Sequence, residues 1–127
     1  MKDKDIAFLK ELCEAPSPTG SEMPAAEVLR KRLAPSADAI DTDVMGSVHA
    51  LLKGSGKAPS VMLAGHIDEV GLIITYLDDD GFLYFASLGG VDAAILPGMR
   101  VDVHTKGGTL RGVMGRKPIH LITADER

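Results

Sequence analysis

The spacing of apolar residues changes from helical to strand-like along the chain. Residues 3–14 carry apolar side chains every three or four positions, which predicts a helix with Cys13 packed on its apolar face. The segment 15–20 contains two prolines and a glycine, which end that helix. A second helix is predicted over residues 21–33, with Ser21 as its N-cap and Pro24 in its first turn.

Alternation of apolar and polar residues then predicts three antiparallel strand pairs, each closed by a turn that contains glycine. The expected pairs are 40–44 with 48–52, 72–77 with 82–88, and 99–105 with 109–114. No helical pattern occurs between residues 71 and 115. The chain therefore changes near residue 70 from a mixed α/β part, 1–69, to a β-rich part, 70–127.

A short apolar run, 61–64, is typical of a strand that is covered on both faces. It leads into the motif Gly65-His66-Ile67-Asp68-Glu69-Val70-Gly71. In a strand, His66 and Asp68 would face the same side, and the flanking glycines would allow backbone or substrate to come close. Imidazole is a good ligand for zinc or cobalt, and a carboxylate on its other nitrogen fixes the binding tautomer. A lone histidine after a strand is more often a structural residue, so the motif by itself leaves metal binding open.

Composition narrows the class of protein. The 127 residues include 45% hydrophobic and 25% charged residues, which is ordinary for a globular protein. The net charge of −4 and the mixed distribution of charges argue against a nucleic-acid partner. No stretch is long and apolar enough to predict a membrane span, and the charged N-terminus is unlike a signal peptide. The single cysteine cannot form a disulfide within the chain, which fits a cytoplasmic setting.

Other polar residues have simpler interpretations than catalysis. Glu69 should point away from Asp68 and make a structural hydrogen bond or a subunit contact. His120 is expected to shape a loop or an oligomer contact rather than bind metal. The remaining candidates are interpreted as exposed strand residues (His49, His104), a turn (Asp78, Asp79, Asp80) and helix caps (Ser17, Ser21).

Several ordered motifs together resemble the N-terminal part of the M42 metallo-aminopeptidases, the glutamyl and tetrahedral aminopeptidase group, some of which carry an endoglucanase label. The resemblance is strongest at Ala64–Gly71 and runs through nearly the whole chain. The other motifs are Leu12-Cys13-Glu14-Ala15-Pro16-Ser17-Pro18-Thr19-Gly20-Ser21-Glu22, Asp43-Val44-Met45-Gly46-Ser47-Val48, Gly89-Gly90, Leu96-Pro97-Gly98 and Gly112-Val113-Met114-Gly115-Arg116-Lys117-Pro118-Ile119-His120-Leu121.

This resemblance implies a fold and a chemistry. Residues 1–69 would be the N-terminal part of a zinc-peptidase-like α/β domain, and 70–127 part of an inserted β-rich dimerisation domain, a barrel or sandwich. The family binds two divalent metal ions, zinc or cobalt, and removes N-terminal residues from peptides. The resemblance implies that His66 is a metal ligand and that Asp68 is a catalytic residue which orients and polarises His66. It also implies that the chain forms homo-oligomers.

The resemblance also implies that the remaining acidic and histidine ligands, and the general base, follow the inserted domain and lie outside these 127 residues. We therefore expect this chain alone to bind metal weakly or not at all, since a zinc site ordinarily needs three or four protein ligands. A second chain would be one source of the missing ligands. The alternative function is a catalytically inactive module that acts in oligomer assembly or protein contact.

Overall fold

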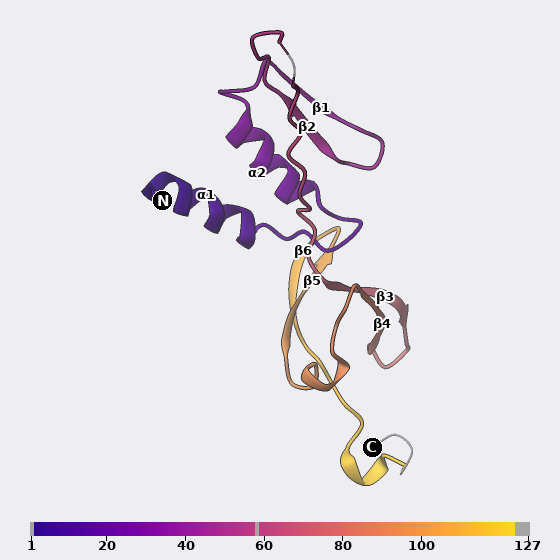
Figure 1. Ribbon diagram of the computed structural model, residues 1–127. Helices are drawn as coiled ribbons and strands as arrows, with labels where there is room; N and C mark the ends of the chain where they lie inside the picture. Colours follow the sequence, from indigo (N-terminus) through magenta and orange to yellow (C-terminus); the bar gives the residue numbers. More distant parts are fainter. Residues whose placement is uncertain (1, 58, 124–127) are drawn as a thin grey trace. The chain divides into compact units, whose positions relative to one another are not determined.

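The computed structural model describes residues 2–57 and 59–123 (Figure 1). The chain forms two compact units, Met1–Gly90 and Val91–Arg127. The division falls 21 residues beyond the predicted boundary at 69/70. The predicted boundary concerns the domains of a longer fold, whereas this division reflects clusters of contacts, so the boundary at 69/70 stays a prediction.

Two helices and two strand pairs make up the first unit. The elements are α1 (Asp3–Glu14), α2 (Met23–Leu33), β1 (Ala39–Thr42), β2 (Val48–Leu51), β3 (Gly71–Leu77) and β4 (Leu83–Leu88). Helix α1 lies beside α2, and α2 lies beside β2 (Figure 1). The strands pair antiparallel as β1 with β2 and β3 with β4. The predicted bounds of these six elements are thus confirmed to within two residues at each end.

Small side chains allow the two helices to approach. Ala25 and Ala26 of α2 are 1% and 2% exposed, and they are the buried apolar residues among those described in the first unit. Arg32 of α2 reaches back to α1, where its guanidinium lies 2.8 Å from Asp5 and 5.3 Å from the centre of the Phe8 ring. The guanidinium therefore links the two helices by charge and by a cation–π contact.

The helix α2 begins later than the sequence predicts. Glu22 is its N-cap residue and Pro24 lies in the first turn, as expected for proline. The N-cap assignment of Ser21 is wrong, because its amide instead closes a turn onto the carbonyl of Pro18, 2.8 Å away. Ser17 is not a cap either: its side chain is buried, and its backbone is paired with another segment.

The apolar face of α1 is less covered than its periodicity predicts. Ile6 and Leu9 are 50% and 48% exposed, and Cys13 is exposed. The prediction that Cys13 is packed is wrong, because its side chain is exposed. Helical periodicity identifies an apolar face but does not supply its partner.

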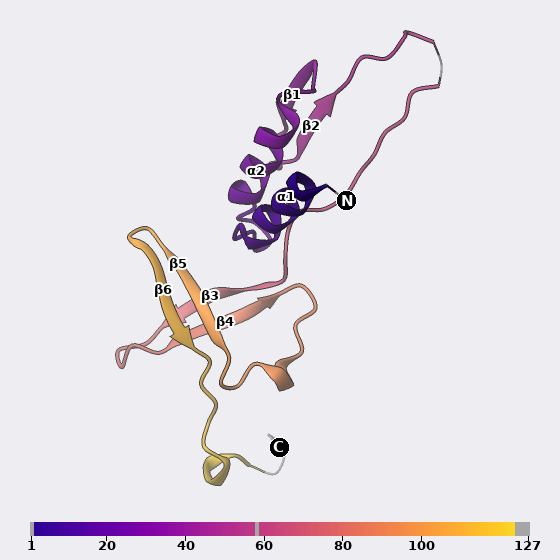
Figure 2. The same ribbon diagram turned by 90° about the vertical axis from the view of Figure 1, so that its left-hand side faces the viewer.

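The segment between β2 and β3 has no helix or regular strand among its described residues (Figure 2). Val61, Met62 and Leu63 are 80%, 85% and 93% exposed. The strand predicted over residues 61–64 is therefore wrong for this structure. A strand is stabilised by hydrogen bonds to a neighbouring strand, and no described segment lies in register with this run.

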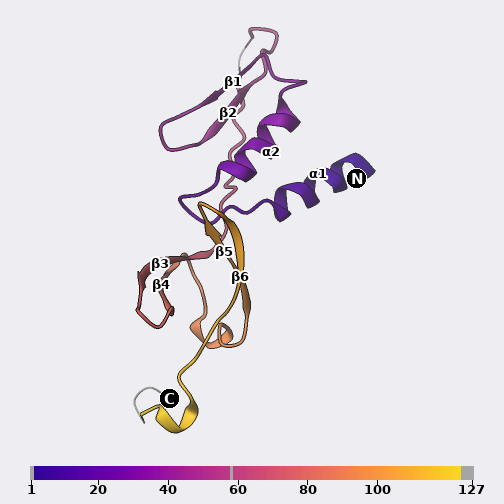
Figure 3. The ribbon, with the colours of Figure 1, turned by 180° about the vertical axis from the view of Figure 1, so that it is seen from behind.

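The second unit is built on one hairpin. It contains η1 (Ala93–Ile95), β5 (Arg100–Thr105), β6 (Gly108–Val113) and η2 (Ile119–Leu121), and β5 pairs antiparallel with β6 (Figure 3). Met114 continues the pairing, since its amide donates to the carbonyl of Met99 at 2.8 Å and its carbonyl accepts from Gly98 at 2.9 Å. None of the described helices is long and apolar enough to cross a membrane.

Candidate functional site

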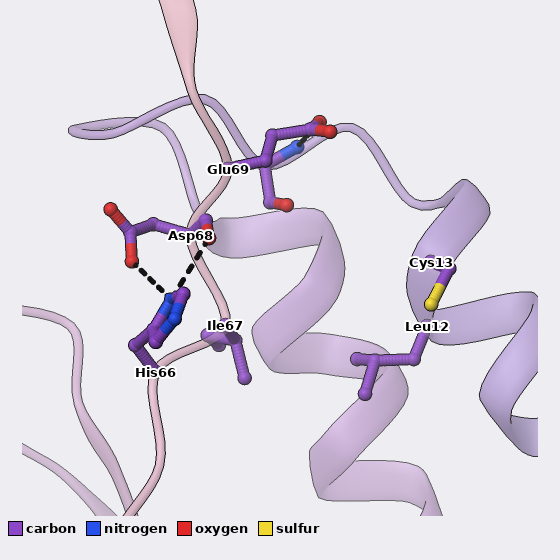
Figure 4. Close-up of a pocket in the computed structure, with 7 residues that line it drawn as sticks. Leu12, Cys13, His66, Ile67, Asp68 and Glu69 are labelled. Atoms are coloured by element: carbon purple, nitrogen blue, oxygen red, sulfur yellow. Dashed lines mark hydrogen bonds and ion pairs between the residues drawn. The ribbon is translucent and has the colours of Figure 1, made fainter. Parts of the chain in front are cut away.

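His66 and Asp68 face each other, as the motif predicts, but they are not in a strand. The His66 Nδ1 atom lies 3.0 Å from the Asp68 Oδ1 atom and 3.1 Å from the Asp68 carbonyl oxygen (Figure 4). The backbone at these residues is in no regular element, so the pairing does not come from the alternation of a regular strand. The predicted juxtaposition is confirmed and its predicted cause is wrong.

This geometry selects one tautomer of the His66 ring. Both oxygens near Nδ1 are hydrogen-bond acceptors, because one is a carbonyl and the other a carboxylate. The Nδ1 atom must therefore carry the hydrogen and donate it, which leaves the lone pair on Nε2 free. The His66 side chain is 86% exposed, so its Nε2 atom is open to a ligand.

The carboxylate of Asp68 is held from its other side by Thr19. The Thr19 hydroxyl donates to Asp68 Oδ2 at 2.8 Å, across 49 residues of sequence. That hydrogen bond is the main cause that lowers the pKa of Asp68; burial opposes it to a smaller extent, and the hydrogen bond and electrostatic interaction with His66 lower the pKa further. Asp68 is therefore an anion at neutral pH, which suits it to accept from His66.

Thr19 is the site residue that the sequence interpretation missed. It lies in the loop after α1, within the segment Leu12–Glu22 on which the family resemblance partly rested. A threonine in a Pro-Thr-Gly turn has an ordinary explanation in loop geometry. Only the fold brings its hydroxyl to the carboxylate of Asp68.

Glu69 fixes the same loop through the backbone. Its side chain points away from the carboxylate of Asp68 (Figure 4), and its Oε1 atom accepts from the Ser17 amide at 3.0 Å. The Glu69 amide donates to the Ser17 carbonyl at 2.9 Å, and the Thr19 amide donates to the Glu69 carbonyl at 3.2 Å. The structural role predicted for Glu69 is confirmed, and it is a role in joining the two segments of the site.

The two glycines that flank the motif, Gly65 and Gly71, differ in the space around them. A Cβ atom on Gly71 would lie 2.8 Å from the Cβ atom of Pro18, so only glycine allows the loop to approach β3 this closely. A Cβ atom on Gly65 would meet nothing within 4 Å. The predicted close approach is confirmed at Gly71 and not found at Gly65 among the described residues.

His66, Asp68 and Glu69 border a shallow hollow of about 330 Å³ on the first unit. Its walls come from the end of α1 (Leu12 and Cys13), from Ser17, and from the segment 66–69 (Figure 4). The apolar side chains of Leu12 and Ile67 face the hollow beside the polar pair. The site thus offers one open imidazole nitrogen next to a small apolar surface.

The other predicted polar residues lie elsewhere. Asp78 stabilises its turn by accepting from the amides of Asp80 and Phe82, which confirms the turn interpretation. His49 and His104 are exposed on strands, as predicted. His104 Nδ1 lies 3.3 Å from the Thr109 hydroxyl. His120 is exposed in η2, where its predicted role as a loop or oligomer residue stays a prediction.

The donor set fits one ligand position of a metal site. The described residues contain no group of three or more His, Cys, Asp or Glu side chains placed to hold a metal ion. A catalytic zinc needs about three protein ligands. His66, with its free Nε2 atom and its carboxylate partner, has the form of one such ligand.

Comparison with known proteins identifies aminopeptidases as relatives of this chain. The sequence family described as M42 glutamyl aminopeptidase matches residues 46–127. The lysyl aminopeptidase of Pyrococcus furiosus is 35% identical over 118 residues, which cover 92% of this chain and 34% of that protein. These relatives are about three times as long as this chain.

Solved structures agree with the sequence match. The TET aminopeptidase from the marine sediment archaeon Thaumarchaeota archaeon SCGC AB-539-E09 superimposes with a TM-score of 0.89 at 37% identity, over 98% of this chain and 35% of that one. The Pyrococcus horikoshii TET1 peptidase, which assembles into a tetrahedron or a large octahedral shell, gives 0.76 at 34% identity over 91% of this chain and 34% of its own. The chain spans about a third of the length of the proteins it matches, shares their mixed α/β fold, and belongs to the M42 family of aminopeptidases.

Proposed function

We propose that this chain supplies part of the active site of a metal-dependent aminopeptidase that removes N-terminal residues from peptides. The observation that carries the proposal is the ring of His66, whose Nδ1 atom donates to Asp68 while its Nε2 atom is open. Family membership supports the reaction class, since M42 aminopeptidases are metallopeptidases.

In this proposal His66 is a ligand of one of two divalent ions, zinc or cobalt, and Asp68 is the catalytic residue that orients it. When bound, two such ions activate a water molecule and polarise the scissile carbonyl. The negative charge of Asp68 makes the imidazole a more basic donor at Nε2 and prevents the ring from turning. The further ligands and the general base come from residues outside those described.

The test compares two histidine variants. In an aminoacyl-p-nitroanilide assay with added cobalt or zinc, on the protein that carries the complete site, His66→Ala should abolish turnover. His104→Ala should leave it unchanged, because His104 is an exposed strand residue whose Nδ1 atom lies beside the Thr109 hydroxyl. A second readout uses the ring signals of the four histidines in NMR spectra during addition of cobalt. Paramagnetic broadening confined to His66 supports the proposal, and equal broadening of all four rings or undiminished turnover of His66→Ala contradicts it.

A second candidate function is a non-catalytic module that acts in assembly. Large apolar side chains are exposed on β3 and β4, including Ile73, Tyr76 and Phe85 at 50%, 60% and 42%. A homo-oligomer would bury such a surface, and the Pyrococcus horikoshii TET1 peptidase forms large assemblies. A stable oligomer by light scattering without any turnover, in the presence of either metal, would favour this function. We also propose a reducing cytoplasmic setting, because the single cysteine cannot form a disulfide within the chain.

A further inference from the structure

The loop after α1 is connected to the candidate ligand by a chain of two hydrogen bonds. The Thr19 hydroxyl donates to Asp68 Oδ2 at 2.8 Å, and the His66 ring donates from Nδ1 to Asp68 Oδ1 at 3.0 Å. Each oxygen of the carboxylate thus accepts one hydrogen bond, Oδ2 from Thr19 and Oδ1 from His66. Since the terminal torsion of an aspartate side chain is otherwise broad, each bond restricts the other.

The hydroxyl of Thr19 is itself well placed to do this. It lies 3.4 Å from the Glu69 carbonyl and 2.8 Å from the Asp68 carboxylate, so its single proton goes to the closer, charged acceptor. The backbone of Thr19 is held by the hydrogen bond that its amide donates to the Glu69 carbonyl, and a β-branched side chain has few rotamers. The hydroxyl therefore has a defined direction before it meets Asp68.

We infer that Thr19 is a positioning residue, which sets the tautomer and the orientation of the His66 ring by fixing the carboxylate of Asp68. The functional consequence rests on the proposed role of His66 as a ligand, but the positioning itself does not require a metal. Without the hydroxyl, the Asp68 carboxylate is free to turn toward water, and the ring keeps only the carbonyl of Asp68 as a fixed acceptor.

The experiment measures the tautomer of His66 in the metal-free chain. Long-range proton–nitrogen NMR correlations on the chain labelled with ¹⁵N-histidine, at a pH of about 8 where imidazoles are neutral, distinguish Nδ1–H from Nε2–H. The wild-type ring should be mainly Nδ1–H. Thr19→Val, which keeps the side-chain shape and removes the hydroxyl, should lower the ratio of Nδ1–H to Nε2–H several-fold. Thr19→Ser should restore it.

Thr109→Val is the matched control, because that hydroxyl lies 3.3 Å from Nδ1 of a different histidine, His104. It should alter the signals of His104 and leave those of His66 in place. An unchanged His66 ratio in Thr19→Val overturns the inference, and so does a Thr19→Ser variant that behaves like Thr19→Val. If Thr19→Val and Thr19→Ala both lose the amide signals of α1 and α2, the hydroxyl serves the fold and the inference is also overturned.

These outcomes are separate from those of the proposed function. Cobalt broadening that spares His66, combined with a tautomer that responds to Thr19, would remove the metal role and keep the positioning role. Selective broadening of His66, combined with a tautomer ratio that does not change in Thr19→Val, would keep the metal role and remove the positioning role.

Discussion

Ser17 and Glu69 are joined by two hydrogen bonds, one from the Ser17 amide to the Glu69 carboxylate at 3.0 Å and one from the Glu69 amide to the Ser17 carbonyl at 2.9 Å. They link the end of the first helix to the segment that carries His66, across 52 residues. Ser17 is only 5% exposed, so its amide has little access to water. The stability of this link and the geometry of the site are therefore connected.

Replacing Glu69 with alanine should destabilise the fold by about 1 to 2 kcal/mol, because it leaves the buried Ser17 amide without its acceptor. Urea unfolding followed by circular dichroism measures this loss. Glu69→Gln keeps an oxygen acceptor and should lose less. The control is Glu14→Ala, whose exposed pair with Lys10 at 3.8 Å contributes at most about 0.5 kcal/mol. Equal losses at Glu69 and Glu14 would contradict the structural role.

Gly71→Ala should cost about 1 to 3 kcal/mol, since the new methyl group would be forced against Pro18, whose Cβ atom lies 2.8 Å away. The same clash should displace Thr19 and shift the ring signals of His66. Gly65→Ala is the matched control, because a Cβ atom there meets nothing within 4 Å and its cost should stay within about 0.5 kcal/mol. Unfolding midpoints and histidine spectra of the two variants decide the matter, and similar values for both would rule out the clash.

Features that depend on local sequence could be predicted well. The Asp-Gly turn before β4 and the glycine at φ 90° between β1 and β2 fix their hairpins within a few residues, so periodicity and turn chemistry located these strands. The helix α1 was likewise predicted from its periodicity and from the prolines that follow it.

Features that depend on contacts with distant segments of the chain could not be predicted from the sequence. The run at residues 61–64 has the composition of a covered strand, but a strand requires a neighbour, and its side chains are exposed in the described structure. Cys13 was assigned to a core for the same reason. The His66–Asp68 pair was foreseen from two-residue spacing, whereas Thr19 lies 49 residues from Asp68 and no local pattern marks it. The metal role of His66 and the catalytic role of Asp68 stay predictions.

The β1–β2 turn should respond to acid through Asp43. Its Oδ1 atom accepts from the amides of Met45 and Ser47 at 2.9 Å each, and the bond from Ser47 is the main cause that lowers the pKa of Asp43 below its ordinary value of 3.8. A depressed folded-state pKa stabilises the fold above the unfolded-state value, and this contribution is lost as the pH falls through the lower folded-state pKa.

The amide shifts of Met45 and Ser47 should therefore change with pH in a transition whose midpoint lies below the ordinary aspartate pKa of 3.8. In Asp43→Asn this transition should disappear, while Asp41→Asn, on the adjoining strand, should retain it. A transition of the Ser47 amide that is centred above the ordinary value of 3.8 would contradict the direction of the shift.

The last prediction concerns metal affinity in the protein that carries the complete site. Removing the carboxylate in Asp68→Ala should weaken zinc or cobalt binding about 10- to 100-fold, because His66 loses the group that fixes its tautomer and raises its basicity. Competition with a chelator measures the dissociation constant. Asp102→Ala, which removes a carboxylate 3.1 Å from Arg111 in the other unit, is the control for a general change in charge. If both variants weaken metal binding equally, the effect comes from the change in net charge, and Asp68 does not specifically orient His66.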